Sequence, residues 1–170
     1  MSETLQPALP DDLDEQAERL MRRMCDAGLC IATAESCTGG MLAALLTDIE
    51  GAGHAFERGF VTYTSESKTE LLGIEPGLLE VNQAVSEPVA RAMAKGALNA
   101  SHADIAIGIT GFAGPAGENN EEGLVHMALA RRDGETVHRE EHFGAVGRGD
   151  VRLRSLKAML EMLEESLDRA

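Results

Sequence analysis

The residues best suited to chemistry begin with a glycine-bearing turn, ESCTGG at 35–40, between an apolar run and a predicted helix. Gly39 and Gly40 would let backbone N–H groups approach an anion closely, and the helix would add the positive end of its dipole. Ser36 and Thr38 supply hydroxyl groups at the same place. The turn matches neither the phosphate loop GxxxxGK[ST] nor the nucleophile elbow GxSxG, so a plain helix cap is an equal interpretation.

A second candidate is the segment YTSESK, which runs from Tyr63 to Lys68. A strand end followed by a helical turn would place the phenol and the amine over one crevice. A lysine that burial pushes toward its neutral form can accept a proton from a serine hydroxyl, which makes Ser and Lys a nucleophile pair. The alternative is that Lys68 is a solvated helix residue.

Two further candidates consist of hydrogen-bond donors. The segment TGFAGP ends an apolar run, and the Thr110 hydroxyl and the N–H groups from Gly111 onward would donate to a carbonyl oxyanion or a phosphate. Arg148 and Arg152 open the predicted last helix and would bind a phosphate through forked hydrogen bonds. The alternatives are a strand-ending turn and ordinary surface charges.

The remaining nucleophiles and metal ligands form weaker patterns. Cys37 is a rival to Ser36, because a helix N-terminus would stabilise its thiolate. His138 and His142 are four positions apart on a predicted strand, which is roughly 13 Å and too far for one metal ion. The other histidines are scattered along the chain: His54, His102 and His126. We therefore expect neither a metal nor a cofactor.

Alternating strands and helices must position these groups. Apolar runs predict strands at 29–34, 58–64, 104–110 and 124–130, and the polar segment 136–143 is expected to be a fifth strand. Asp133-Gly134 predicts a hairpin between the last two strands. Helical spacing and capping residues predict helices at 11–27, 41–49, 65–74 and 86–100 and a long C-terminal one. This order is typical of an α/β protein in which 104–110 is central and the polar run 136–143 is an edge.

The organisation of the chain is predicted to be simple. Residues 1–10 contain two prolines and no periodicity, so they are expected to be a flexible lead-in to a single domain at 11–170. Pro76 predicts another turn, with Leu78, Leu79 and Val81 packed beneath it.

Composition limits the classes of partner. The 170 residues include 15 basic and 29 acidic side chains, a net charge of −14 with histidines neutral. This charge argues against nucleic acid and membrane partners, because phosphate-rich surfaces are held by clustered Lys and Arg. Aromatic residues are only 3%, so platforms for stacking single-stranded bases have little material. Three cysteines without a zinc or redox spacing, and a polar N-terminus without a signal-peptide pattern, predict a soluble cytoplasmic protein.

The chain resembles the CinA C-terminal domain family, whose free-standing members are PncC-type nicotinamide-nucleotide amidases. Four segments carry the likeness in the family's order: AESCTGGMLAALLT, GFVTYTSESK, AVSEPVARAMAKGAL and TGFAGPAG. The likeness runs from about Ala17 to Leu167. It implies a three-layer α/β/α fold around a mixed, roughly five-stranded sheet. It also implies hydrolysis of the carboxamide of nicotinamide mononucleotide (NMN) to nicotinate mononucleotide and ammonia, with no metal.

The resemblance also implies roles for individual residues. The family's site residues match Ser36, Tyr63, Lys68, Thr110 and, near the last helix, Arg148, with Arg152 left open. Ser36 would attack the amide, Lys68 would take its proton, and Tyr63 would orient Lys68 or the amide. Backbone N–H groups at 37–40, or Thr110, would hold the oxyanion. The arginine would anchor the ribose phosphate.

The sequence leaves rival functions open. Gln83 stands where the family commonly has Gly, which puts substrate affinity in question without touching the implied Ser, Tyr or Lys. One alternative is a non-catalytic nucleotide-binding or regulatory domain, and another is a partner in DNA transformation or damage response. Homo-oligomers occur in the family, so the resemblance adds a homo-oligomer as an open alternative to a monomer.

Overall fold

The computed structural model describes residues 9–169 of the chain. The strands are β1 (Ile31–Glu35), β2 (Phe56–Val61), β3 (Ile105–Gly111), β4 (Leu124–Arg131) and β5 (Thr136–His142). The helices are α1 (Asp11–Ala27), α2 (Met41–Thr47), α3 (Ser65–Leu72), α4 (Pro76–Asn82), α5 (Glu87–Asn99) and α6 (Arg148–Asp168), with a 3₁₀ turn, η1, at Gly53–Ala55. Within the described range no helix combines the length and the apolar character needed to cross a membrane. Of the expected lead-in, residues 1–8 lie outside that range.

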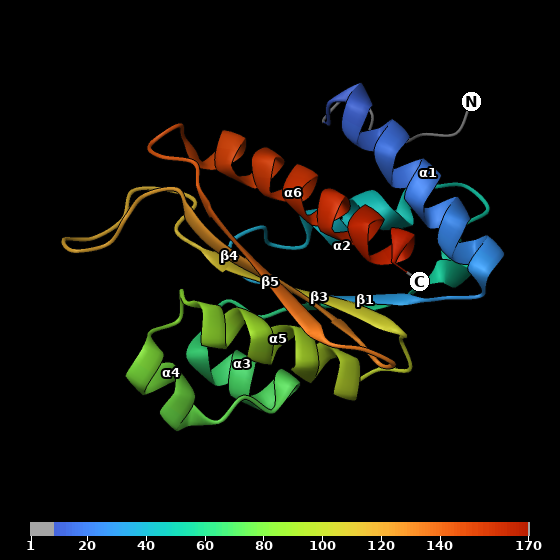
Figure 1. Ribbon diagram of the computed structural model, residues 1–170. Coiled ribbons are helices and arrows are strands. Elements are labelled where there is room, and N and C mark those ends of the chain that lie inside the picture. Colours follow the sequence, from blue (N-terminus) through green and yellow to red (C-terminus); the bar gives the residue numbers. More distant parts are fainter. Residues whose placement is uncertain (1–8, 170) are drawn as a thin grey trace.

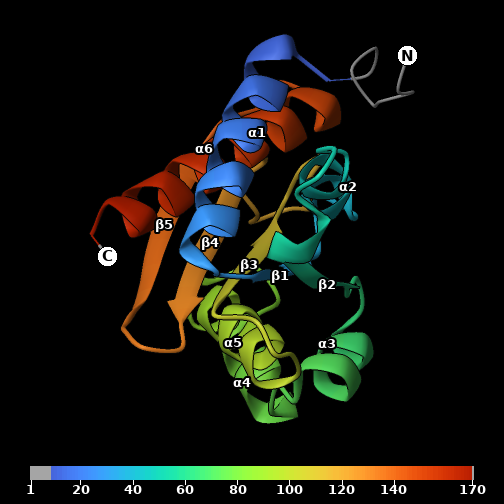
Figure 2. The same cartoon turned by 90° about the vertical axis from the view of Figure 1, so that its right-hand side faces the viewer.

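The strands form one mixed sheet in the order β2-β1-β3-β4-β5. β1 is parallel to both of its neighbours, whereas β4 runs antiparallel to β3 and to β5. Figure 2 shows this order across the sheet. β3 lies at the centre and the polar β5 at an edge, as predicted. Because β1, β2 and β3 run in the same direction, the loops that follow them meet at one edge of the sheet.

Helices cover both faces of the sheet, with α1, α2 and α6 on one side and α3, α4 and α5 on the other (Figure 1). Side chains alternate along β3, so its isoleucines join the core under α1 and α6 while Ala106 packs under α5. A Cβ on Gly108 would lie 2.5 Å from the main-chain nitrogen of Ala94. The small residues on this face therefore let α5 approach the sheet closely. The predicted three-layer α/β/α fold with a five-stranded mixed sheet is confirmed.

Two local predictions differ from the structure. The segment after Pro76 is a helix, α4, rather than a turn, because Pro occupies its first position, where the missing N–H is not needed. Val81 is 83% exposed, so it does not pack beneath this segment, whereas Leu79 is buried. The second strand ends at Val61, three residues earlier than predicted. Residues 62–64 are thereby free to lead into α3.

Gln83, which directly follows α4, has the backbone angles φ 61° and ψ 162°. This region of backbone space is almost restricted to glycine, and other residues there carry strain of about 1–3 kcal/mol. We expect Gln83→Gly to raise the free energy of unfolding by about 1 kcal/mol, or the melting temperature by about 2–4 °C. Thermal unfolding checks this, with Gln83→Ala, which keeps the strain, as the control. An unchanged or lower melting temperature for the glycine variant would contradict the prediction.

Candidate active site

A cleft of about 230 Å³ at the carboxyl ends of the parallel strands brings together most of the predicted residues. Ser36 follows β1, Tyr63 and Lys68 follow β2, Thr110 to Pro115 lie at and beyond the end of β3, and Arg148 opens α6. The remaining lining residues are Cys37, Ala84 and Val85. Residues far apart in the sequence meet here because parallel strands end at the same edge.

The Lys68 amine lies 3.1 Å from the Ser36 hydroxyl oxygen, although the two residues are 32 positions apart. Lys68 is 0% exposed, so its interpretation as a solvated helix residue is wrong. Thr64 caps α3 by accepting a hydrogen bond from the Ser67 amide, which fixes where the helix begins. The first turn of α3 then directs Lys68 into the protein.

Two main-chain carbonyls hold the Lys68 amine in place. Its Nζ donates to the carbonyl oxygens of Thr62 at 2.8 Å and of Tyr63 at 3.1 Å. Burial lowers the pKa of Lys68 from its ordinary value of 10.5. In the neutral form, two N–H bonds serve the carbonyls and the lone pair is left for the third contact, the Ser36 hydroxyl. That arrangement is the one a general base requires.

Cys37 is buried next to Ser36, and burial raises the pKa of its thiol to about 12. A thiolate at this position would raise the pKa of Lys68, but the thiol stays neutral near pH 7. Because the thiolate is the nucleophilic form of cysteine, these surroundings favour Ser36 over Cys37 as the nucleophile.

The glycine-bearing turn is held by Glu35, a residue that sequence reasoning did not single out. Its carboxylate accepts hydrogen bonds from the Thr38 hydroxyl at 2.6 Å and from the Gly40 amide at 3.1 Å. The Gly39 amide donates to the Ser36 carbonyl at 3.2 Å. The Thr38 hydroxyl and the Gly39 and Gly40 amides, which the sequence offered to an anion, are thus bonded within the protein. The available signal was an acidic residue at the end of an otherwise apolar strand.

Thr110 and Tyr63 lie at the cleft, where the Thr110 hydroxyl is bonded to the protein and the Tyr63 side chain is exposed. The Thr110 hydroxyl donates to the Ala84 carbonyl at 2.7 Å, which ties the end of β3 to the loop that forms one wall. Gly111 lines the cleft beside it. The Tyr63 side chain is 67% exposed, and Tyr63 contacts Lys68 through its main-chain carbonyl instead of its phenol.

The two arginines have different surroundings. Arg148 lines the cleft, and within residues 9–169 no carboxylate forms an ion pair with it. A Cβ on Gly114 would lie 2.5 Å from Arg148 Nη2, so the glycine makes room for the guanidinium. Arg152 Nε instead donates to the Cys37 carbonyl at 2.8 Å. Arg148 is therefore placed to meet an anion in the cleft, while Arg152 supports the turn that carries Ser36.

His126 is not isolated, contrary to the prediction, because neighbouring strands bring it against His138. The two rings stack with their centroids 5.3 Å apart, and His126 Nδ1 lies 3.1 Å from His138 Nε2. Glu140 lies 3.5 Å from His126, and Glu87 lies 3.7 Å from His138. In the described part of the chain, no group of three or more His, Cys, Asp or Glu residues is arranged to hold a metal ion.

This histidine pair predicts a pH-dependent stability. Burial lowers the pKa of His126 and of His138 from the ordinary 6.5, although the nearby carboxylates of Glu140 and Glu87 oppose the shift. Below pH 6.5 these histidines bind protons in the unfolded chain but stay neutral to lower pH in the folded protein. The free energy of unfolding therefore falls as the pH falls. We expect His138→Gln to reduce the loss of melting temperature between about pH 8 and about pH 5.5. The control is His54→Gln, at an exposed histidine. The prediction is refuted if His138→Gln loses as much melting temperature between about pH 8 and about pH 5.5 as this control does.

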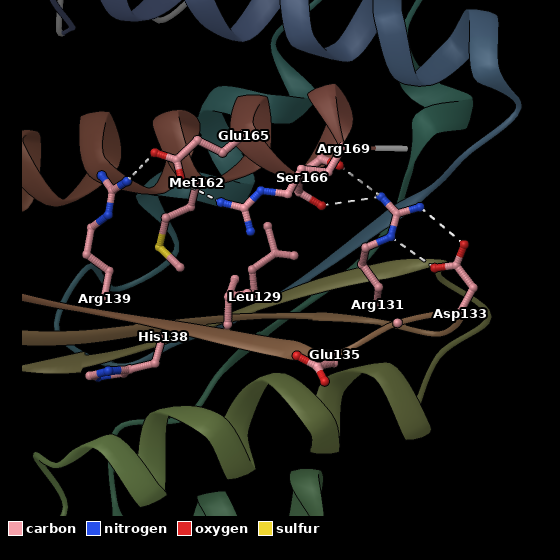
Figure 3. A pocket seen from close by; sticks show the side chains of 12 residues that line it. Leu129, Arg131, Asp133, Glu135, His138, Arg139, Met162, Glu165, Ser166 and Arg169 are labelled. Carbon is pink, nitrogen blue, oxygen red and sulfur yellow. Dashed lines mark hydrogen bonds and ion pairs between the residues drawn. The ribbon is translucent and has the colours of Figure 1, made fainter.

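A larger cavity, of about 580 Å³, lies between the β4–β5 hairpin and the C-terminal part of α6 (Figure 3). Several of its charged side chains pair with one another, as in the contacts of Arg131 with Asp133 and of Arg139 with Glu165. His138 lies on the α5 side of the strands in this view. None of the Ser, Lys or Tyr residues singled out from the sequence lines this cavity. The smaller cleft is therefore the candidate site.

Comparisons with known proteins show the family of the chain. The model of the CinA C-terminal domain matches residues 13–167. The chain is 44% identical over 134 residues to the nicotinamide-nucleotide amidohydrolase PncC of Escherichia coli K12. The matched region covers 78% of this chain and 81% of that protein. It is 45% identical over 154 residues to a CinA-like protein of Mycobacterium marinum, covering 89% of this chain but only 36% of that longer protein.

A solved structure has the same fold over nearly the whole length. The competence/damage inducible protein CihA from Agrobacterium tumefaciens superposes with a TM-score of 0.90 at 41% identity, and 99% of each chain is covered. The family model spans most of the chain, and the relatives share both its sequence and its architecture. The chain therefore belongs to the CinA C-terminal domain family.

Proposed function

We propose that this protein is an amidohydrolase that converts NMN and water to nicotinate mononucleotide and ammonia. The observation that carries the proposal is the buried Lys68 amine 3.1 Å from the Ser36 hydroxyl in an open cleft. Similarity to the E. coli protein named for nicotinamide-nucleotide amidohydrolysis supports the choice of substrate.

The proposed reaction has two steps, with Ser36 as the nucleophile in the first and water in the second. Ser36 Oγ attacks the carboxamide carbon while its proton passes to neutral Lys68, and the protonated amine then delivers a proton to the departing ammonia. Water next attacks the acyl-enzyme ester with the help of Lys68, and the nicotinate carboxylate leaves as Ser36 regains its proton. No metal is needed, because serine supplies the nucleophile and lysine moves the protons.

Donors for the oxyanion come from the turn beside Ser36. Within the described residues, the Gly39 amide is bonded to the Ser36 carbonyl and the Gly40 amide to Glu35. We assign the stabilisation of the negative charge on the tetrahedral intermediate to the amides of Cys37 and Thr38, which directly follow Ser36. The Thr110 hydroxyl, which donates to the Ala84 carbonyl, has the role of holding the cleft wall.

The test of this function is ammonia release from NMN by the purified protein, with nicotinamide and nicotinamide riboside as comparison substrates. We expect NMN to be hydrolysed with the highest kcat/KM, because the phosphate binding energy helps to fix the distant amide. Calorimetric binding of NMN without ammonia release would replace this proposal with a non-catalytic nucleotide-binding domain. Salt-sensitive retention on DNA would support the DNA-partner alternative.

Arg148 is expected to anchor the phosphate. Replacing it by glutamine removes the guanidinium from the cleft, and we expect kcat/KM for NMN to fall by about 10- to 100-fold. The same substitution should change the hydrolysis of nicotinamide riboside, which has no phosphate, by less than about 3-fold. Steady-state kinetics on both substrates measure this difference. Equal losses on both would show that Arg148 does not act through the phosphate.

A further inference from the structure

Glu35 is a buried carboxylate whose bonding partners are all neutral groups of the protein. It is 1% exposed and accepts four hydrogen bonds. The donors are the Thr38 hydroxyl at 2.6 Å, the Ala43 amide at 2.8 Å and the amides of Gly40 and Leu42, each at 3.1 Å. A buried carboxylate is costly unless its oxygens are bonded, and here both oxygens are.

This carboxylate takes the place of an ordinary helix cap. Gly40, the residue that precedes α2, has no side chain to cap the helix. Glu35 supplies the missing acceptor from the end of β1 and interacts favourably with the positive end of α2. Strand, turn and helix are thereby joined by a single side chain.

The position of Glu35 links this cap to both members of the proposed catalytic pair. It directly precedes Ser36, whose amide donates to the Ile109 carbonyl at 3.1 Å. The main-chain carbonyl of Glu35 accepts a hydrogen bond from the Thr62 amide at 2.9 Å, and the Thr62 carbonyl in turn accepts one from Lys68 Nζ. Ser36 is thus anchored to β3 on one side, and the turn beyond it depends on the Glu35 side chain.

We propose that Glu35 is a positioning residue: its carboxylate holds the 36–40 turn so that the Ser36 hydroxyl faces Lys68 and the turn's amides face the reacting carbonyl. The kinetic part of this proposal rests on the proposed function. Glu35 makes no contact with substrate in this role and acts only through the turn.

Glu35→Gln tests the role at nearly constant side-chain volume. The glutamine side chain has one oxygen and one NH₂ group, and the NH₂ group cannot accept a hydrogen bond. It would face either the Ala43 amide, which donates to one Glu35 oxygen in the parent protein, or the three donors to the other Glu35 oxygen. We expect kcat for ammonia release from NMN to fall by about 10- to 100-fold while KM changes by less than about 3-fold. The exposed Glu80 on α4 gives the matched control, Glu80→Gln, which should leave both constants unchanged. A folded Glu35→Gln protein with kcat within about 2-fold of the parent would overturn the proposal.

Thr38→Val provides a second, milder test if the glutamine variant does not fold. Valine has the shape of threonine but cannot donate to Glu35, so only the 2.6 Å bond is lost. We expect kcat to fall by about 3- to 10-fold with KM unchanged. A folded Thr38→Val protein with kcat within about 2-fold of the parent would count against the proposal.

A substrate-independent measurement separates this proposal from the proposed function. A small fluorophosphonate should label Ser36, and intact-protein mass spectrometry follows the rate. If the parent protein is labelled but releases no ammonia from NMN, the proposed function fails while the role of Glu35 is still decided by labelling. Labelling at least about 10-fold slower in Glu35→Gln supports that role, and an unchanged rate refutes it.

Discussion

Ammonia release from NMN is expected to fall by at least about 10⁴-fold when Ser36 is replaced by alanine. The substitution removes the atom that would form the acyl-enzyme, and the remaining groups of the cleft can only bind and polarise the amide. Ser36 is almost fully buried in a turn fixed by main-chain and carboxylate contacts, so the alanine variant should fold normally. Rates are measured by coupled ammonia detection, and folding by circular dichroism and thermal unfolding.

The rival nucleophile supplies the discriminating comparison. Cys37→Ala keeps the main-chain N–H and removes only a thiol whose pKa burial raises to about 12. We expect its kcat to stay within about 3-fold of the parent value. If Ser36→Ala retained turnover while Cys37→Ala lost it, the nucleophile would be the cysteine and the proposed mechanism would be wrong.

Replacing Lys68 by methionine is expected to lower kcat by about 10²- to 10⁴-fold, the range over which general-base catalysis contributes. Methionine fills much of the same buried space without an amine, so Ser36 loses the group 3.1 Å away that would accept its proton. Lys68→Arg should be equally inactive, because a guanidinium stays protonated and cannot serve as a base. Activity within about 10-fold of the parent in both variants would exclude Lys68 as the base.

The pH dependence gives a second measurement on the same residue. Since burial lowers the pKa of Lys68 from 10.5, kcat/KM should rise with pH and level off below the pH at which an ordinary lysine loses its proton. Stability should follow the same sign. Between the folded-state pKa and 10.5 the unfolded chain binds a proton that the folded protein does not, so stability rises with pH across this window. Lys68→Met should remove that contribution, and an unaltered stability profile would mean that the buried amine does not titrate as described.

Sequence patterns predicted the order of strands and helices and the positions of the candidate residues along the chain, whereas the three layers were implied by the family resemblance. Apolar runs predicted β1 to β4, including the central β3, because burial leaves a record in local sequence. The Asp133-Gly134 hairpin signal predicted that the polar β5 follows β4 as an edge. Local reasoning failed at α4, where a proline that opens a helix resembles one that opens a turn.

Only the tertiary structure decided what each candidate side chain touches. The sequence left Lys68 open as a solvated residue, offered Thr38 and Gly40 to an anion and did not single out Glu35. In the folded protein Lys68 is buried against Ser36, while Glu35 already bonds to Thr38 and Gly40. Lys68 and Ser36 come from different loops and elements. Glu35 and its partners lie across a turn whose course local propensity does not fix. Periodicity records which face of an element is buried, but hydrogen-bond partners depend on how parallel strands align at their ends, which is set by packing across the whole sheet.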